Sequence, residues 1–451
     1  MEGERSNEAS ARASPRAEKK ALTAPEKLVR LLERIQGASD PPLALLDEFQ
    51  LAYRQSPRGI RESFFSLLLT RMEVPREPLE GPLNAVASAA ADDPVRWTSL
   101  LTDLRRKLES PRMRAFRRFL NASGGLKFLL DLRADVLEAS LDLGPIDEEI
   151  AYLFTSWFQY GFLFLHEITQ ESSYRQIRFL KEHDLVHPMA SLEEMGNRLG
   201  EDRRSFALYH RAMPEEPIVF IEAALTRRIP TSIHEILDDS RSGPETKPDT
   251  AIFYSINNAQ NGLVGLGLGK LLIYQVVDAI KRNRPQVQTF ATLSPITGLL
   301  SRYLKPILAG SDAPFKMKRA ELVRLFPESA RLKVLARGVS QEFADALAQV
   351  LSDPGWLEDR ALTKELEKPL TRIAYFHLTQ EKDAAGKPLN PVAGFHLGNG
   401  ARLGAKHVYF GANRTERGVL DSCGIMVSYI YSSTWLHELQ RSVSSMLPWQ
   451  R

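Results

Sequence analysis

The sequence predicts a mixed α+β protein, with an all-helical N-terminal domain at residues 26–160 and a second, mixed domain at residues 161–451. In the first segment apolar residues recur every three to four positions, and strand-like alternation is almost absent. β-rich runs appear only after Phe162, at PIVFIEAAL (217–225) and AIFYSI (251–256), and a helical pattern follows each of them.

The helical pattern of the first domain is carried by regularly spaced leucines and phenylalanines. They include Leu28, Leu31, Leu32, Ile35, Phe116, Phe119, Leu120, Phe128 and Leu129. No carboxylates, histidines or glycines in this domain have the spacing of a catalytic or ligand-binding motif. We therefore expect a scaffold or an oligomerisation domain, and a homo-oligomer, either a dimer or a tetramer.

Composition sets limits on partners and compartment. The 59 Lys and Arg residues nearly balance the 56 Asp and Glu residues, so the net charge of +3 does not favour nucleic acid or an anionic membrane as a partner. The single cysteine, Cys423, cannot form an intrachain disulfide, which favours a reducing compartment. No apolar run reaches the length of a membrane span. We expect a cytoplasmic protein.

Residues 1–25 are rich in Glu, Ser, Ala, Arg and Lys and offer little to bury, so we expect a disordered arm. Its acidic residues argue against a transit peptide. The C-terminal residues 448–451 do not match a peroxisomal signal. Helical periodicity returns at about 315–380, which predicts a helical insertion in the second domain, and again at 435–447, which predicts a final helix.

The most informative segment combines two strands, a glycine-rich turn and a helix. The strand 251–256 leads into Gly262, Gly265, Gly267 and Gly269, then a helix, and then a second strand, VQTFATL, which ends at Ser294. Strand, helix and strand in this order form a βαβ crossover with parallel strands. The glycine turn and Ser294 should therefore face one crevice.

Glycines at the start of a helix let backbone N–H groups approach an anion such as a pyrophosphate. Tight helix packing is the structural alternative, and the sequence leaves both open. A dinucleotide-binding motif is excluded because Asp278, the next acidic residue, lies inside the same helix. A P-loop is excluded because Leu271 stands where Ser or Thr would bind magnesium.

The turn resembles the acyl-CoA-binding turn of GNAT acyltransferases. The corresponding residues are Val264, Gly265, Leu266, Gly267, Leu268 and Gly269. Val264 departs from the Gln or Arg of that pattern, which leaves the backbone donors unaffected. Lys270, in the first helical turn, is the best candidate for the 3′-phosphate of coenzyme A.

Five segments together resemble the malonyl-CoA decarboxylase family. They are GFLFLHEITQESS (161–173), AIFYSINNAQNGLVGLGLG (251–269), FATLSPITG (290–298), NPVAGFHLGNGARL (390–403) and RGVLDSCGIMVSYIY (417–431). The resemblance implies a GNAT-like, acyl-CoA-binding catalytic domain with a helical insertion. It also implies conversion of malonyl-CoA to acetyl-CoA and carbon dioxide without metal, biotin or pyridoxal phosphate.

The resemblance implies a catalytic pair, with Ser294 as proton acceptor and His396 as proton donor. Decarboxylation leaves an enolate, so the site must stabilise negative charge and deliver a proton to carbon. Taken alone, Ser294 would be a turn residue and His396 a structural histidine. A hydrolase nucleophile is disfavoured because Ser294 has no GxSxG context and Pro295 has no N–H for an oxyanion hole. Asn399-Gly400 predicts a hairpin, which would place His396 on a short strand.

Three further residues are candidates for the acyl pocket: Asn390, and Tyr429 with Tyr431, which alternate on a predicted strand. Cys423 is expected to be a small buried residue. The remaining histidines lack metal-ligand spacing, so no zinc is expected; they are His377, His407 and His437. A GNAT-type acetyltransferase and a non-enzymatic helical adaptor stay as alternatives to a decarboxylase.

Overall fold

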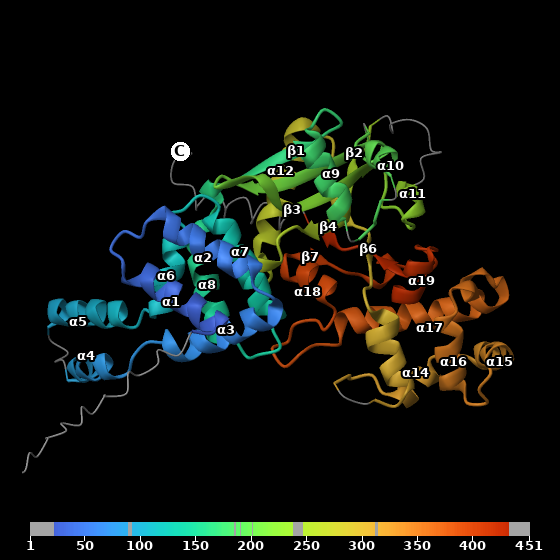
Figure 1. The fold of residues 1–451 in the computed structure, drawn as a ribbon. Coiled ribbons are helices and arrows are strands. Elements are labelled where there is room, and N and C mark those ends of the chain that lie inside the picture. The colour runs from blue at the N-terminus through green and yellow to red at the C-terminus, as the bar shows by residue number, and fades with distance from the viewer. Residues whose placement is uncertain are drawn as a thin grey trace, which may run out of the picture. The chain divides into compact units, whose positions relative to one another are not determined.

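The computed structural model describes residues 22–88, 93–184, 186–189, 191–200, 202–237, 247–311 and 314–432 (Figure 1). The chain divides into two compact units at Phe154/Thr155. The first unit is helical throughout its described residues. Its helices are α1 (Ala24–Gly37), α2 (Leu43–Gln55), α3 (Arg58–Arg71), α4 (Glu77–Ala87), α5 (Pro94–Lys107), α6 (Pro111–Phe119), α7 (Gly125–Glu138) and α8 (Gly144–Trp157), the last of which crosses the division.

Helix α1 begins two residues before the predicted start of the helical domain. The Glu26 carboxylate accepts hydrogen bonds from the N–H and the hydroxyl of Thr23, both at 2.9 Å, and so caps the first turn. The remainder of the predicted disordered arm, residues 1–21, lies outside the described residues.

The helical unit is held together by aromatic packing and by ion pairs of buried arginines such as Arg112. Phe49 lies 5.4 Å from Phe119 and 5.9 Å from both Phe64 and Phe128, measured between ring centroids. Arg112 is 1% exposed, and its guanidinium donates to Glu149 in a bidentate pair and to Glu73 at 2.8 Å.

The second unit contains a seven-stranded sheet in the order β1-β2-β3-β4-β5-β10-β7 and a small sheet in the order β6-β9-β8. The pair β4/β5 is parallel, and the other strand pairs of the described residues are antiparallel. The strands are β1 (Leu163–Ile168), β2 (Arg203–His210), β3 (Met213–Thr226), β4 (Thr250–Asn258), β5 (Thr289–Thr292), β6 (Ser294–Pro295), β7 (Ala401–Arg402), β8 (Val408–Tyr409), β9 (Met426–Val427) and β10 (Ile430–Tyr431).

The second unit also contains helices, which lie between the strands along the chain. They are α9 (Tyr174–His183), α10 (Leu192–Asn197), α11 (His234–Leu237), α12 (Leu268–Asn283), α13 (Lys305–Leu308), α14 (Arg319–Arg324), α15 (Glu328–Arg337), α16 (Phe343–Ser352), α17 (Arg360–Thr379), α18 (Pro391–Gly398) and α19 (Glu416–Ser422). Leu180 of α9 and Met195 of α10 pack against Ala207, Tyr209 and Phe220 of the sheet.

The predicted mixed α+β class is confirmed, and so is the βαβ crossover, because α12 connects the parallel strands β4 and β5. Helices α14 to α17 lie in the segment predicted as a helical insertion (Figure 1). The predicted final helix at 435–447 lies outside the described residues. Among the described residues, every helix is too short or too polar to span a lipid bilayer.

The prediction of a strand around His396 is wrong. Residues 391–398 form α18, because the Asn390 side chain accepts from the Ala393 N–H at 3.0 Å and Pro391 occupies the first turn, where its missing N–H costs nothing. Asn399-Gly400 follows the helix instead of closing a hairpin, and only Ala401 and Arg402 form strand β7.

The buried ion pairs of Arg112 generate a stability prediction. Replacing Arg112 with Ala leaves the carboxylates of Glu73 and Glu149 without their cation, so the free energy of unfolding should fall by about 3 kcal/mol. Urea denaturation measures this change. Arg34→Ala is the control, because Arg34 and Glu48 are both more than half exposed and 3.9 Å apart, and it should cost less than about 1 kcal/mol. Equal losses in the two variants would contradict the role of Arg112.

Candidate functional site

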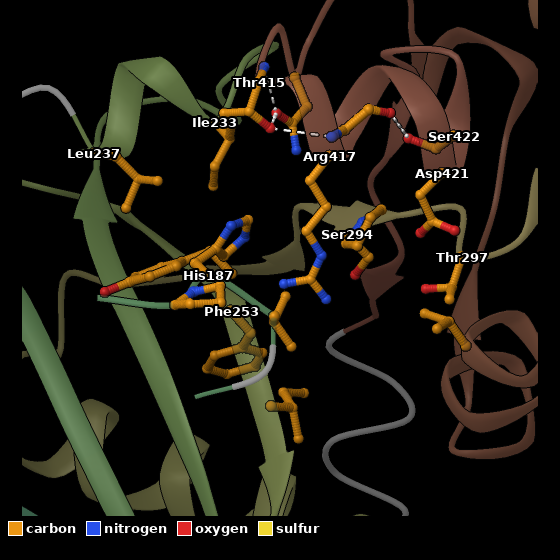
Figure 2. A pocket seen from close by; sticks show the side chains of 18 of the residues that line it. His187, Ile233, Leu237, Phe253, Ser294, Thr297, Thr415, Arg417, Asp421 and Ser422 are labelled. Atoms are coloured by element: carbon orange, nitrogen blue, oxygen red, sulfur yellow. Dashed lines mark hydrogen bonds between the residues drawn. The ribbon is translucent and has the colours of Figure 1, made fainter. Parts of the chain in front are cut away.

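Two cavities of the second unit meet at His396. The serine cavity, about 610 Å³, has Ser294, Phe253 and Arg417 on its wall (Figure 2), and the glycine cavity, about 650 Å³, is lined by the glycine turn and α18. Three residues line both cavities: Ile256, Val392 and His396. Ser294 and the glycine turn were predicted to face one crevice; the structure places them on two cavities that share His396 in their walls.

The glycine turn has a backbone that requires glycine at two positions. Gly265 has φ +84° and Gly267 has φ +71°, in the left-handed region that side chains disfavour. Gly267 is the N-cap of α12, a helix of 16 residues whose first amides have no partner within the helix. These amides therefore open toward the glycine cavity and can bind an anionic group.

The other residues of the turn have different surroundings. Val264 is exposed and lines the glycine cavity with Leu268, while Leu266 is half-buried and Lys270 is exposed in the first turn of α12. A Cβ atom on Gly269 would lie 2.1 Å from Cε2 of Phe395. Gly269 thus allows α12 to pack closely on α18, so the packing interpretation of the glycines holds at this position.

Ser294 is fixed at the start of β6. It pairs with Val427 of β9 and is 8% exposed. Its hydroxyl donates to Oγ1 of Thr292 at 3.0 Å, and the same oxygen accepts from the N–H of Tyr429 at 3.1 Å. The serine is therefore anchored to Thr292 at the end of β5, which also binds the backbone of Tyr429.

His396 is held from two sides. Its Nδ1 lies 2.8 Å from the hydroxyl of Tyr431, and its ring stacks on Tyr429 with centroids 4.7 Å apart and planes at 24°. Burial lowers the pKa of His396 to about 3, so the imidazole is neutral at pH 7. Among the described residues Ser294 and His396 share no direct hydrogen bond, but both face the serine cavity.

The three predicted acyl-pocket residues contact His396 or cap the helix that carries it. Tyr431 belongs to β10, whereas Tyr429 precedes it, so the predicted continuous strand is absent there. Neither tyrosine is on the described wall of the two cavities, and burial raises the pKa of both phenols. Asn390 caps α18 and donates to the Thr297 carbonyl at 3.2 Å. All three residues position α18 and its imidazole.

Several residues of the serine cavity were not found by sequence reasoning. Arg417, His187, Arg198 and Tyr254 line it together with Asp421. They come from β4, α19 and the segments around α10, and no spacing links them. Arg417 and Asp421 lie in the motif 417–431 and Tyr254 lies in the motif 251–269, but nothing within those motifs singled them out.

Arg198, on the wall of this cavity, forms a buried ion pair with Asp184. Asp184 accepts from Arg198 at 3.0 Å and from Ser255 and Asn257 at 2.8 Å each. Glu222 lies 3.5 Å from the same arginine, and burial raises its pKa to about 8. Asp184 thus neutralises Arg198, and Glu222 retains a proton at pH 7.

The remaining candidate residues are three histidines and Cys423. No group of three potential ligands occurs among the described residues, and His437 lies outside them. His377 is buried in α17 against Tyr303, and His407 lies in the turn before β8. Cys423 is buried as expected, and burial raises its pKa to about 12.

Comparison with known proteins identifies relatives over both units. Residues 161–442 match the malonyl-CoA decarboxylase C-terminal domain, and residues 76–158 match the N-terminal domain. The mitochondrial malonyl-CoA decarboxylase of Anser anser anser is 35% identical over 333 residues, which cover 71% of this chain and 64% of the goose protein. The chain therefore spans less than two thirds of that relative's length.

Solved structures are similar over nearly the whole chain. The malonyl-CoA decarboxylase of Agrobacterium vitis has a TM-score of 0.76 and 30% identity, with 95% of this chain and 96% of that chain covered. The enzyme of Rhodopseudomonas palustris has a TM-score of 0.75 and 29% identity, with 94% and 91% covered.

The low pKa of His396 predicts a pH-dependent loss of stability. Below pH 6.5 the unfolded chain binds a proton at this residue, whereas the folded protein does so only near pH 3. Unfolding is therefore favoured as the pH falls, by about 2 kcal/mol between pH 7 and pH 5.

Urea denaturation at both pH values tests this expectation. His396→Asn should lose about 2 kcal/mol less than the wild type over this range, whatever its stability at pH 7. The control is His166→Gln, which removes an exposed histidine on β1. An identical pH dependence in the wild type and His396→Asn would refute the buried neutral imidazole.

Proposed function

The chain belongs to the malonyl-CoA decarboxylase family, and we propose that it converts malonyl-CoA to acetyl-CoA and carbon dioxide. The observation that carries the proposal is that the walls of the two cavities share His396. A long thioester can enter over the glycine turn and present its acyl end beside both His396 and Ser294.

Coenzyme A would bind along the glycine cavity. Its pyrophosphate would accept from the amides of Gly267 to Gly269 at the start of α12, and Lys270 is the proposed partner of the 3′-phosphate. The pantetheine arm would then pass Ile256 and Val392, the apolar residues common to both cavities. This path leads the thioester to His396 and the malonyl group into the serine cavity.

The reaction breaks the bond between the α-carbon and the carboxylate. The electron pair of that bond becomes the enolate of the thioester, so the substrate is its own electron sink. We propose that no metal, biotin or pyridoxal phosphate takes part. Ser294 and His396 are the polar groups proposed to contact the reacting atoms. His396 is the proposed proton donor. Ser294, the proton acceptor that the family resemblance implies, would hydrogen-bond the malonyl carboxylate and undergoes no net change of protonation in the step described below.

The negative charge of the malonyl carboxylate would favour protonation of His396, the proposed proton donor. The free imidazole is neutral at pH 7 because burial lowers its pKa to about 3. A malonyl carboxylate in the serine cavity would raise that pKa, since an opposite charge stabilises the imidazolium. The imidazolium then donates its proton to the α-carbon of the enolate, which gives acetyl-CoA and regenerates the neutral ring. Each turnover takes one proton from water.

We propose further that the protein is cytoplasmic, acts in malonyl-CoA catabolism and self-associates through its helical unit. Helices α4 and α5 contain no buried residue, and Val95, Trp97 and Leu101 of α5 are exposed. A second copy of the chain could cover these side chains. The single cysteine supports a reducing compartment.

An assay with malonyl-CoA and no acceptor tests the activity directly. The proposal expects stoichiometric carbon dioxide and acetyl-CoA. Absence of carbon dioxide from folded, coenzyme A-binding protein would overturn it, and acyl transfer that needs an added amine would favour an acetyltransferase.

The catalytic pair makes a second, sharper prediction. Ser294→Ala and His396→Asn should each lower kcat at least about 100-fold, because each loses an acid-base or hydrogen-bonding group, while coenzyme A affinity changes little. Steady-state kinetics and calorimetry measure the two effects. Ser301→Ala on the exposed side of the segment after β6 and His166→Gln are matched controls. Wild-type turnover in either pair variant would remove that residue from the mechanism.

A further inference from the structure

We propose that Asn390 is a positioning residue, which sets the separation of Ser294 and His396 by binding the chain after the serine to the helix of the histidine. This inference rests on the proposed function, because it concerns the proposed catalytic pair. Asn390 is 1% exposed and directly precedes α18, which carries His396. Its buried side chain makes one hydrogen bond to each of these two segments.

The two ends of the Asn390 amide have opposite functions. Its Oδ1 accepts from the Ala393 N–H at 3.0 Å and caps α18. Its Nδ2 donates to the carbonyl of Thr297, three residues after Ser294, at 3.2 Å. A carboxylate could form the first bond but not the second, because it has no N–H to donate. The side chain of serine is too short to form both bonds. An amide therefore fits this place in the fold.

The peptide group between Thr297 and Gly298 is held from both sides. Its carbonyl accepts from Asn390, and its N–H donates to Asp421 of α19 at 2.8 Å. Gly298 has φ +75° and directly precedes a π-helix at Leu299–Leu304. Thr297 and Asp421 also line the serine cavity. This part of the cavity wall is thus bound to both α18 and α19.

The strand side of the site also connects the catalytic pair. Thr292 binds the hydroxyl of Ser294 and the backbone N–H of Tyr429, whose ring stacks on His396. These contacts hold the imidazole, whereas Asn390 holds the start of its helix. Loss of the Asn390 bond alone should therefore displace the pair only partially. Since a misplacement of about 1 Å can cost about 100-fold in rate, a partial displacement should cost about tenfold.

Kinetics of Asn390→Ser and Asn390→Asp test the proposal. Both replacements keep an oxygen that can cap α18, and both lose the donor to Thr297; serine does so without adding charge. We expect kcat to fall about tenfold, while KM for malonyl-CoA and the affinity for coenzyme A stay within about twofold. Asn121→Asp is the control for added charge, because Asn121 is exposed in the turn after α6. Wild-type kcat in either folded variant would overturn the proposal.

A double-mutant cycle separates positioning from a general weakening of the fold. Once Ser294→Ala has removed the hydroxyl, its distance from His396 no longer matters. Adding Asn390→Ser to that variant should then lower kcat by less than about twofold. A change that only weakens the helix would cost about tenfold in both backgrounds. Fully additive losses would therefore contradict the positioning role.

A crystal structure of Asn390→Ser tests the geometry without turnover. We expect the separation of the Ser294 hydroxyl and the His396 imidazole to differ by about 0.5 Å or more from that in the wild type, with α18 still capped. An unchanged separation would overturn the inference. The same displacement in a protein that releases no carbon dioxide would refute the decarboxylase function and retain the inference.

Discussion

The site depends on how one buried imidazole is held. His396 stacks on Tyr429 and lies within hydrogen-bonding distance of Tyr431, while the helix that carries it is capped by Asn390. A neutral ring in this position needs no buried counter-ion, and its orientation is fixed before a substrate arrives. Gly269 contributes by letting α12 approach Phe395, so the same contact positions the start of α12 and the imidazole carried by α18.

Patterns that are local in the sequence predicted the fold well. Helical periodicity identified the first unit, and the order of strand, glycine turn, helix and strand identified the parallel pair β4/β5. Adjoining cavities at the end of that crossover follow from parallel topology. Ser294 and His396 were found by motif, and the structure places both on the wall of one cavity.

The secondary-structure predictions were wrong where residues outside the motif determine the structure. Asn399-Gly400 resembles a hairpin signal, but Asn390 and Pro391 start a helix that continues up to it. Periodicity placed Tyr429 and Tyr431 on one strand face. In the structure both tyrosines contact His396 of α18, which lies more than 30 residues earlier in the chain. Arg417 and Arg198 have no shared motif, since folding alone brings α19 and α10 to the same cavity.

A crystal structure with a non-decarboxylating carboxyacyl-CoA such as succinyl-CoA tests the central claim most directly. The account predicts the pyrophosphate at the amides of Gly267 to Gly269 and the thioester within hydrogen-bonding distance of His396, with the acyl group in the serine cavity beside Ser294. A pyrophosphate bound away from α12, or an acyl group that does not reach His396, would contradict the account.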